Sequence, residues 1–186
     1  MSPVADDLSM SSFVILGLLS VCGPRTPYEL KKLVDGSIGY FWDFPRAQLY
    51  VEPERLRSRG LLAEERESEG RRRRTYRITE AGLAALGEWL GAAQTREVEL
   101  RDAGLLKLYF GALMTTEEVI ALARREAETH RRRRQTYIAI ARVLEQQPEE
   151  AFSLATLRLG LRYEEMEIRF WEETAADPPR VPPPHV

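Results

Sequence analysis

The sequence predicts a mostly α-helical protein that begins with a winged helix-turn-helix domain, and three observations lead to this class. Three helical segments, a β-hairpin and a linker helix follow one another within the first 95 residues. Arginine is concentrated around the hairpin. The second half of the chain carries only helical patterns, one of them a heptad repeat, which is typical of an all-helical dimerisation domain.

The first two helices are predicted from burial and capping signals. Residues 11–21 are apolar on nearly every side, which is typical of a buried helix. Thr26 and Glu29 form a capping box with Pro27 at the first helical position, so a second helix begins there. Gly36 is a natural end for this helix, because glycine readily adopts the backbone conformation that follows a last helical turn.

The third helix, the wing and the linker helix complete the first domain. Pro45 opens the third helix and Gly60 ends it. Pro53 lies inside this helix and lacks an N–H group, so we expect it to kink or split the helix. Alternating side chains around a polar turn predict the wing, and Thr79 caps the linker helix. The predicted ranges are 45–59 for the third helix, 61–66 and 72–78 for the strands, 67–70 for the turn, and 80–94 for the linker helix.

The rest of the chain is predicted to be helical. A helix is expected over 99–113 because one side of this segment is apolar. A capping box of Thr115 and Glu118 starts a long helix, and Pro148 separates it from the last one. Five prolines after Asp177 predict an extended tail. The expected domains are 1–95 for the winged helix, 96–176 for the helical dimerisation domain and 177–186 for the tail.

A heptad pattern of residues, called the seam below, runs along one side of the long helix. Its residues recur at alternating steps of three and four, the spacing that lets one helix pack lengthwise on another. The seam can pack against the final helix of the same chain or form a subunit interface. We favour the interface, because this segment alone has too few large apolar residues to form a hydrophobic core. The expected interface residues are Ile120, Ala123, Ala127, His130, Tyr137, Ala141, Leu144, Leu157 and Leu161.

Composition excludes several classes of protein. The 186 residues carry 29 acidic and 27 basic side chains, a net charge of −2, so a nucleic-acid site must be a local patch. One cysteine cannot form an internal disulfide, and the two histidines show no zinc-ligand spacing, so we expect neither metal nor cofactor. The longest apolar stretch, residues 13–22, is too short for a membrane span and lacks the basic flank of a signal peptide. We expect a cytoplasmic protein.

Arginines gather between residues 44 and 78. This segment holds ten arginines and six glutamates, a net charge of +4. Guanidinium groups suit paired contacts to phosphate or guanine. We expect Arg72 and Arg74 on the wing to contact the DNA backbone, and Arg46 to contact DNA from the third helix. The alternative is a solvated hairpin whose arginines pair with its own glutamates.

Other candidate sites are weaker. Trp42, Trp89 and Trp171 are candidate ligand-binding residues, although isolated tryptophans more often belong to a core or an interface. The sequence shows no glycine-rich phosphate loop, no His-Glu-x-x-His motif and no nucleophile elbow. No catalytic residue is predicted, and we do not expect an enzyme.

Several motifs together carry a family resemblance. They are Ile15-Leu16-Gly17-Leu18-Leu19, Thr26-Pro27-Tyr28-Glu29-Leu30, Phe41-Trp42, Gln48-Leu49-Tyr50, Gly60-Leu61-Leu62 and Tyr76-Arg77-Ile78-Thr79. In order and spacing they resemble the PadR family of bacterial transcriptional regulators over residues 10–92. Residues 105–111 and 159–164 resemble the helical C-terminal domain of PadR members related to virulence activators.

The resemblance implies a homodimeric regulator, usually a repressor that binds a palindromic operator and is often released by a small-molecule effector. It places Tyr28, Gln48 and Tyr50 near double-stranded DNA. Pro45 stands where many relatives have serine, so we expect one phosphate contact to be missing. From another class, the alternative is a winged-helix adaptor that binds an acidic protein through its wing and does not bind DNA.

Overall fold

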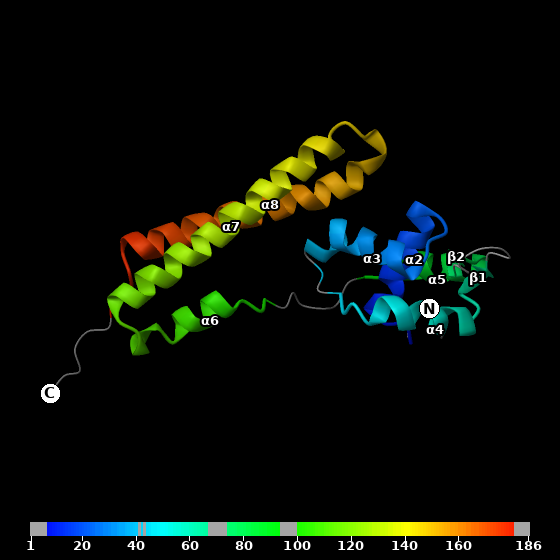
Figure 1. Cartoon of the computed structure of the whole chain (residues 1–186), viewed down its shortest axis with the longest axis horizontal. Helices are drawn as coiled ribbons and strands as arrows, with labels where there is room; N and C mark the ends of the chain where they lie inside the picture. Colours follow the sequence, from blue (N-terminus) through cyan, green and yellow to red (C-terminus); the bar gives the residue numbers. More distant parts are fainter. Residues whose placement is uncertain (1–6, 41, 43, 67–73, 94–99, 181–186) are drawn as a thin grey trace. The chain divides into compact units, whose positions relative to one another are not determined.

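The computed structural model describes residues 7–40, 42, 44–66, 74–93 and 100–180. The chain forms two compact units, Met1–Arg96 and Glu97–Val186 (Figure 1). Among the helices in these described ranges, none combines the length and the apolar character that crossing a membrane requires.

The first unit is a winged helix-turn-helix, which confirms the predicted fold class. Three helices precede a two-stranded antiparallel sheet, and a fourth helix follows it. The elements are α2 (Met10–Cys22), α3 (Pro27–Gly36), the 3₁₀ turn η1 (Ile38–Tyr40), α4 (Gln48–Ser58), β1 (Leu62–Arg66), β2 (Arg74–Ile78) and α5 (Glu80–Gly91).

Local signals set the ends of these helices. The predicted capping box is present, because the Glu29 N–H donates to Thr26 Oγ1 at 3.3 Å and the Thr26 N–H donates to the Glu29 carboxylate at 2.8 Å. Thr79 caps α5 by accepting a hydrogen bond from the Gly82 N–H at 3.1 Å. Gly60 follows α4 with a φ of +74°, which glycine adopts without strain.

Helix α4 differs from the predicted third helix at two points. It begins at Gln48 rather than at Pro45, because residues 45–47 form a turn in which the Gln48 N–H donates to the Pro45 carbonyl at 2.8 Å. The prediction that Pro53 splits the helix is wrong, since α4 is continuous to Ser58. Burial of the Pro53 ring offsets the one backbone hydrogen bond that proline cannot donate.

The wing pairs β1 with β2 in register from Leu62 opposite Ile78 to Arg66 opposite Arg74. Arg25 adds a short third segment, because its backbone exchanges hydrogen bonds with Tyr76 at 3.1 and 2.9 Å. This pairing ties the turn between α2 and α3 to the sheet. The predicted turn at 67–70 and Arg72 lie outside the described residues.

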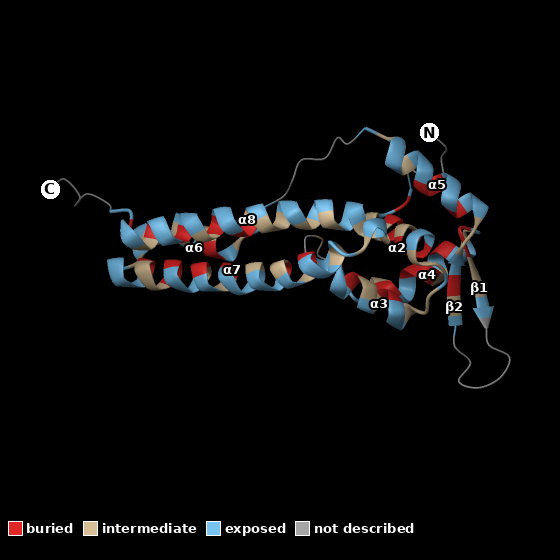
Figure 2. Ribbon diagram, turned by 90° about the horizontal axis from the view of Figure 1, so that it is seen from above, coloured by how far each residue is buried: buried red, intermediate tan, exposed pale blue. Residues whose placement is uncertain are grey.

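The core of the first unit lies between α2, α3, α4 and β1, where buried residues line the inner faces (Figure 2). Ile15, Leu16, Leu30 and Leu56 are fully buried there, which confirms the prediction of a buried first helix. Helix α5 approaches this core closely at Gly82. A Cβ atom on Gly82 would lie 2.3 Å from the Leu61 carbonyl oxygen and 2.8 Å from Ile78.

The second unit is all-helical. The long helices α7 and α8 form an antiparallel pair, and α6 packs against this pair through Leu105 and Leu108 (Figure 1). Trp171, which is fully buried, lies in their common core with Leu122. The elements are α6 (Ala103–Tyr109), η2 (Gly111–Leu113), α7 (Thr116–Leu144), η3 (Pro148–Glu150) and α8 (Ala151–Ala176).

Helix α6 is shorter than the predicted helix over 99–113. It begins after Asp102, whose Oδ1 accepts a hydrogen bond from the Leu105 N–H at 2.9 Å, so the start is set by an N-cap. It ends at Tyr109, and a 3₁₀ turn takes the chain to Leu113. The capping box of Thr115 and Glu118 is present as predicted at the start of α7.

The heptad seam of α7 faces α8 of the same chain. Tyr137 packs on Gly160, where an added Cβ would lie 3.0 Å from the Tyr137 ring. This arrangement favours the intramolecular interpretation of the seam, and the subunit interface stays a prediction. Of the nine predicted interface residues, Ala123, Ala127, His130, Tyr137 and Ala141 are buried within one chain, while Ile120, Leu144, Leu157 and Leu161 are half-buried.

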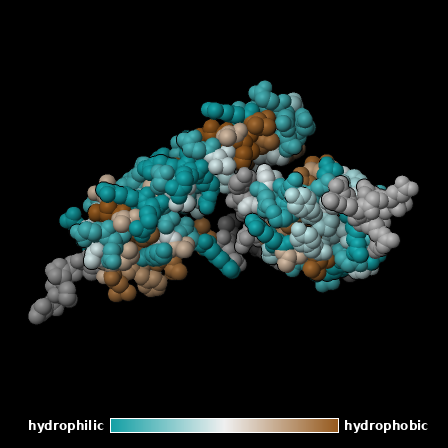
Figure 3. Space-filling model, viewed as in Figure 1, coloured by the Kyte–Doolittle hydropathy of each residue, from teal (hydrophilic) through white to brown (hydrophobic). Residues whose placement is uncertain are grey.

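Large apolar side chains also remain on the surface of the second unit. Figure 3 shows them over α6 and near the turn between α7 and α8. They are Leu106, Tyr109, Phe110 and Leu113 in the α6–η2 segment, Val143 at the end of α7, and Phe152, Leu159 and Met166 on α8. Patches of this kind mark surfaces that other molecules cover.

Candidate nucleic-acid interface

The first turns of α3 and α4 present an exposed surface of mixed polar and aromatic character. Tyr28 on α3 and Tyr50 on α4 are both exposed. Gln48 is the first residue of α4 and is half-buried. The structure therefore leaves these three predicted DNA-contacting residues on the surface of the helix-turn-helix.

Two cations belong to this surface. Arg46 precedes α4, and its side chain is 76% exposed. Among the described residues it pairs with Asp35, whose Oδ1 lies 4.0 Å from Nη2. Lys32 lies over the Tyr28 ring, with Nζ 4.9 Å from the ring centroid. Asp35 is already engaged, because the hydrogen bond from Lys31 lowers the pKa of the Asp35 carboxyl and the charges of Lys31 and Arg46 act in the same direction.

Two arginines of β2, Arg74 and Arg77, contact glutamates of β1. Arg77 Nε donates to Glu65 Oε1 at 2.9 Å, and Arg74 Nε lies 3.6 Å from Glu64 Oε1. Arg57 on α4 also reaches Glu64, at 3.5 Å. These contacts agree with the alternative in which the arginines of a solvated hairpin pair with its own glutamates. The DNA contact of Arg74 stays a prediction, and so does that of Arg72.

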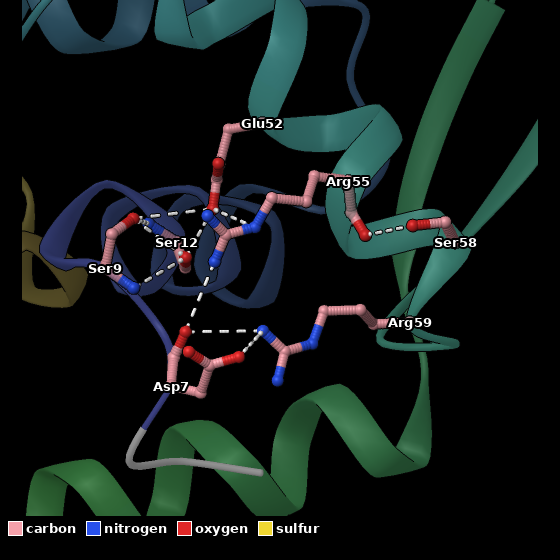
Figure 4. Close-up of polar contacts among 7 residues, drawn as sticks. All are labelled: Asp7, Ser9, Ser12, Glu52, Arg55, Ser58 and Arg59. Carbon is pink, nitrogen blue, oxygen red and sulfur yellow. Dashed lines mark hydrogen bonds and ion pairs between the residues drawn. The ribbon is translucent and has the colours of Figure 1, made fainter.

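Buried Glu52 anchors α4 to the start of α2 (Figure 4). Its carboxylate is 2% exposed, accepts a short hydrogen bond from the Ser12 hydroxyl, and lies 3.4 Å from the Ser9 hydroxyl. Arg55 Nε is 3.8 Å from the same oxygen, so the charge is partly balanced. A buried carboxylate with these partners holds α4 in one position and one rotation about its axis against the core.

Arg55 and a further arginine, Arg59, hold Asp7, which precedes α2 (Figure 4). Arg59 Nη1 donates to the Asp7 carboxylate at 3.1 Å and to the Asp7 carbonyl at 3.3 Å. Arg55 donates to the same carbonyl at 3.3 Å. Arg55 and Arg59 therefore serve the fold, and the net charge of the segment overstates the positive charge available to a ligand.

The three tryptophans belong to the cores of two different units. Trp42 and Trp89 pack against the core of the first unit, where Trp89 stacks on Phe13 with ring centroids 4.7 Å apart. Trp171 belongs to the core of the second unit. Their role in ligand binding stays a prediction.

Together, the three-helix core, the paired wing and the exposed first turns of α3 and α4 define a winged helix-turn-helix protein. Two family models match the chain. The PadR-like family of transcriptional regulators matches residues 15–88, and the virulence activator alpha C-terminal domain matches residues 100–177. The chain belongs to the PadR family of transcriptional regulators.

A curated relative agrees with this assignment. The negative transcriptional regulator PadR of Bacillus subtilis is 27% identical over 108 residues, which is 57% of this chain and 59% of the relative. The chain thus spans less than two thirds of that curated relative in the match.

Solved structures share the fold across both units. Bacillus subtilis PadR in complex with operator DNA has a TM-score of 0.82 at 21% identity, covering 90% of this chain and 98% of the other. The same protein in complex with p-coumaric acid has a TM-score of 0.75 at 20% identity, covering 91% and 97%. The Vibrio cholerae virulence activator AphA has a TM-score of 0.71 at 27% identity, covering 90% and 96%.

Proposed function

We propose that this protein is a sequence-specific DNA-binding transcriptional regulator that represses transcription as a homodimer on a palindromic operator. The observation that carries the proposal is the exposed surface formed by Arg46, Gln48 and Tyr50 at the start of α4, beside Tyr28 and Lys32 on α3. A helix of this kind enters the major groove with its first turns. The solved complex of Bacillus subtilis PadR with operator DNA supports the proposal.

The chemistry of this surface suits direct contact with bases. An arginine can donate two hydrogen bonds to guanine O6 and N7, and a glutamine can pair with adenine N6 and N7. The Arg46 side chain is largely exposed to solvent, and Gln48 is the first residue of α4. Tyr28 and Lys32 lie on the neighbouring helix and suit contacts to the phosphate backbone.

A mobility shift with the DNA upstream of the protein's own gene tests the proposal. Replacing Arg46 or Gln48 by alanine is expected to cost about 1–3 kcal/mol on that DNA, and much less on random DNA, because base contacts are lost. Arg57→Ala is the matched control, because this α4 arginine is held by Glu54 and Glu64. A wild-type protein that shifts neither DNA would overturn the proposal in favour of a protein-binding adaptor.

The wing makes a separate prediction. If Arg72 and Arg74 contact phosphates, replacing both by alanine weakens specific and non-specific binding alike. The plot of log affinity against log salt is also expected to become shallower by about one unit for each lost contact, counted per dimer. Binding titrations at four salt concentrations measure this slope. An unchanged slope would assign Arg74 to Glu64 alone, the contact seen at 3.6 Å.

We place the homodimer contact of the proposal on the exposed apolar residues of the second unit. Phe152, Leu159 and Met166 are 89%, 70% and 53% exposed. Their seven-residue spacing puts them on one side of α8, away from the face that packs on α7. The α6–η2 patch adds further apolar area, and a second copy of the chain is the occupant that a palindromic operator requires.

A small-molecule effector that releases the operator belongs to the same proposal. The complex of Bacillus subtilis PadR with p-coumaric acid supports this part of it. Titration of the protein–DNA complex with p-coumaric acid and related phenolic acids tests it, and dissociation at ligand concentrations that leave the protein folded is the expected result.

A further inference from the structure

A buried polar cluster lies inside the second unit, where α6, α7 and α8 meet. His130 comes from α7, and Glu164 and Glu167 come from α8; they are 4%, 2% and 4% exposed. Asp102, the N-cap of α6, is half-buried beside them. Charged groups are rarely buried to this extent without a compensating partner.

The histidine is oriented by one of the two glutamates. His130 Nδ1 lies 2.6 Å from Glu164 Oε2. A carboxylate accepts hydrogen bonds, so this contact suits a proton on Nδ1, and Nε2 is the ring nitrogen that a metal ion would take. Nε2 points toward Glu167 Oε2 at 3.9 Å, which is too long for a hydrogen bond.

The Glu167 carboxylate has an oxygen without a partner. Glu167 Oε2 is buried and accepts no hydrogen bond from the described residues. Arg133 is engaged elsewhere, because its Nη1 lies 3.4 Å from Glu164 Oε1.

A cavity of about 300 Å³ opens beside this cluster. Asp102, Glu126, His130 and Tyr163 line it, together with Arg101 and Arg133. The cavity reaches two of the three proposed ligands, Asp102 and His130, and leaves room for water, while Glu167 lies behind its lining. One ligand atom each from Asp102, His130 and Glu167 lies within 4.8 Å of the others.

We propose that Asp102, His130 and Glu167 bind a divalent first-row transition metal ion, with Glu164 holding the imidazole in the ligating orientation. An imidazole nitrogen with two carboxylates suits Zn²⁺ and its neighbours rather than Mg²⁺ or Ca²⁺. Tetrahedral coordination places ligand atoms about 3.3 Å apart. The side chains would therefore have to close on the ion from the present separations, which are 3.9 Å for His130 Nε2 and Glu167 Oε2 and no more than 4.8 Å within the group. A carboxylate behind the histidine is the usual outer partner of such a ligand.

The ion would join three helices. Asp102 caps α6 with Oδ1, which leaves its second oxygen for the metal. His130 and Glu167 belong to the long pair α7 and α8. Binding would therefore fix the start of α6 to that pair, and it would bring a positive charge to Glu167 Oε2, which accepts no hydrogen bond from the described residues.

Zn²⁺ binding to the full-length chain, freed of metal with EDTA, tests the site by isothermal titration at pH 7.5. We expect one Zn²⁺ per chain. Asp102→Asn, which preserves the helix cap, and Glu167→Gln should each weaken binding by on the order of 100-fold. Glu165→Gln is the matched control, because this α8 glutamate is exposed and pairs with Arg134. His185→Ala removes the chain's other imidazole and should bind as wild type.

Thermal unfolding gives a second readout that separates metal binding from a structural role. In EDTA, Glu167→Gln should unfold at or above the wild-type temperature, because the variant replaces a buried negative charge, one oxygen of which accepts no hydrogen bond from the described residues, by a neutral amide. With Zn²⁺, the wild type should gain stability and Glu167→Gln should not. Absence of saturable binding to the wild type, or binding that survives in both Asp102→Asn and Glu167→Gln, would overturn the proposal.

Discussion

Replacing Gly82 by alanine is expected to lower the free energy of unfolding of the first unit by on the order of 3 kcal/mol. The new Cβ would lie 2.3 Å from the Leu61 carbonyl oxygen and 2.8 Å from Ile78. The Leu61 oxygen cannot move easily, because it is a backbone atom next to the wing. The second contact is with Cγ1 of Ile78, a residue whose backbone is paired with Leu62 in the sheet. Helix α5 would have to move away from the core, and the cap at Thr79 would move with it.

Gly87→Ala in the same helix is the matched control. A Cβ at Gly87 meets nothing within 4 Å, and this position is exposed. Alanine is the better helix former, so this variant should gain about 0.5–1 kcal/mol. Urea unfolding followed by circular dichroism measures both changes. If Gly82→Ala unfolded at the wild-type urea concentration, α5 would not approach Leu61 this closely.

The second large effect is expected from the apolar stripe of α8. Replacing Phe152 and Leu159 together by glutamate should make the protein monomeric, because each new carboxylate would be buried in the proposed dimer contact without a partner. A monomer engages one half-site instead of two, so operator affinity should fall by about 10²–10⁴-fold. Sedimentation velocity and a mobility shift measure the two consequences on the same samples.

Arg158→Glu is the control for this double variant. It introduces the same side chain next to Leu159, on the polar flank of α8, and should leave the dimer intact. The double variant should also keep its helical circular dichroism, because Phe152 and Leu159 contribute little to the core of the chain. If the double variant still sediments as a dimer, the dimer contact lies on another surface, such as the α6–η2 patch.

The helices could be predicted well because their signals are local. The capping boxes at Thr26 and Thr115 depend only on residues three positions apart, and both are present in the structure. The prediction failed where an end is set by a less regular feature. Helix α4 starts after a turn at residues 45–47, and α6 starts at an aspartate cap that a search for apolar periodicity does not detect.

The candidate sites could be predicted only in part. Exposed residues at the start of α4 follow from the helix-turn-helix pattern, because a surface position needs no knowledge of distant partners. Glu52 was missed, although its place between Leu49 and Leu56 on the apolar face was an available signal. The ligands of the proposed metal site lie on three separate helices, so no short spacing in the sequence connects them.

Along α4, the exposed residues and the buried residues that hold the helix against the core occupy different positions. Tyr50 and Val51 are exposed, while Leu49, Glu52 and Leu56 are buried. On the proposed function, exchanging residues at positions 46, 48, 50 and 51 should therefore alter operator preference, with the supporting positions left untouched. A combinatorial library over these four positions should yield mostly folded proteins, which makes this helix a practical starting point for regulators directed at new promoters.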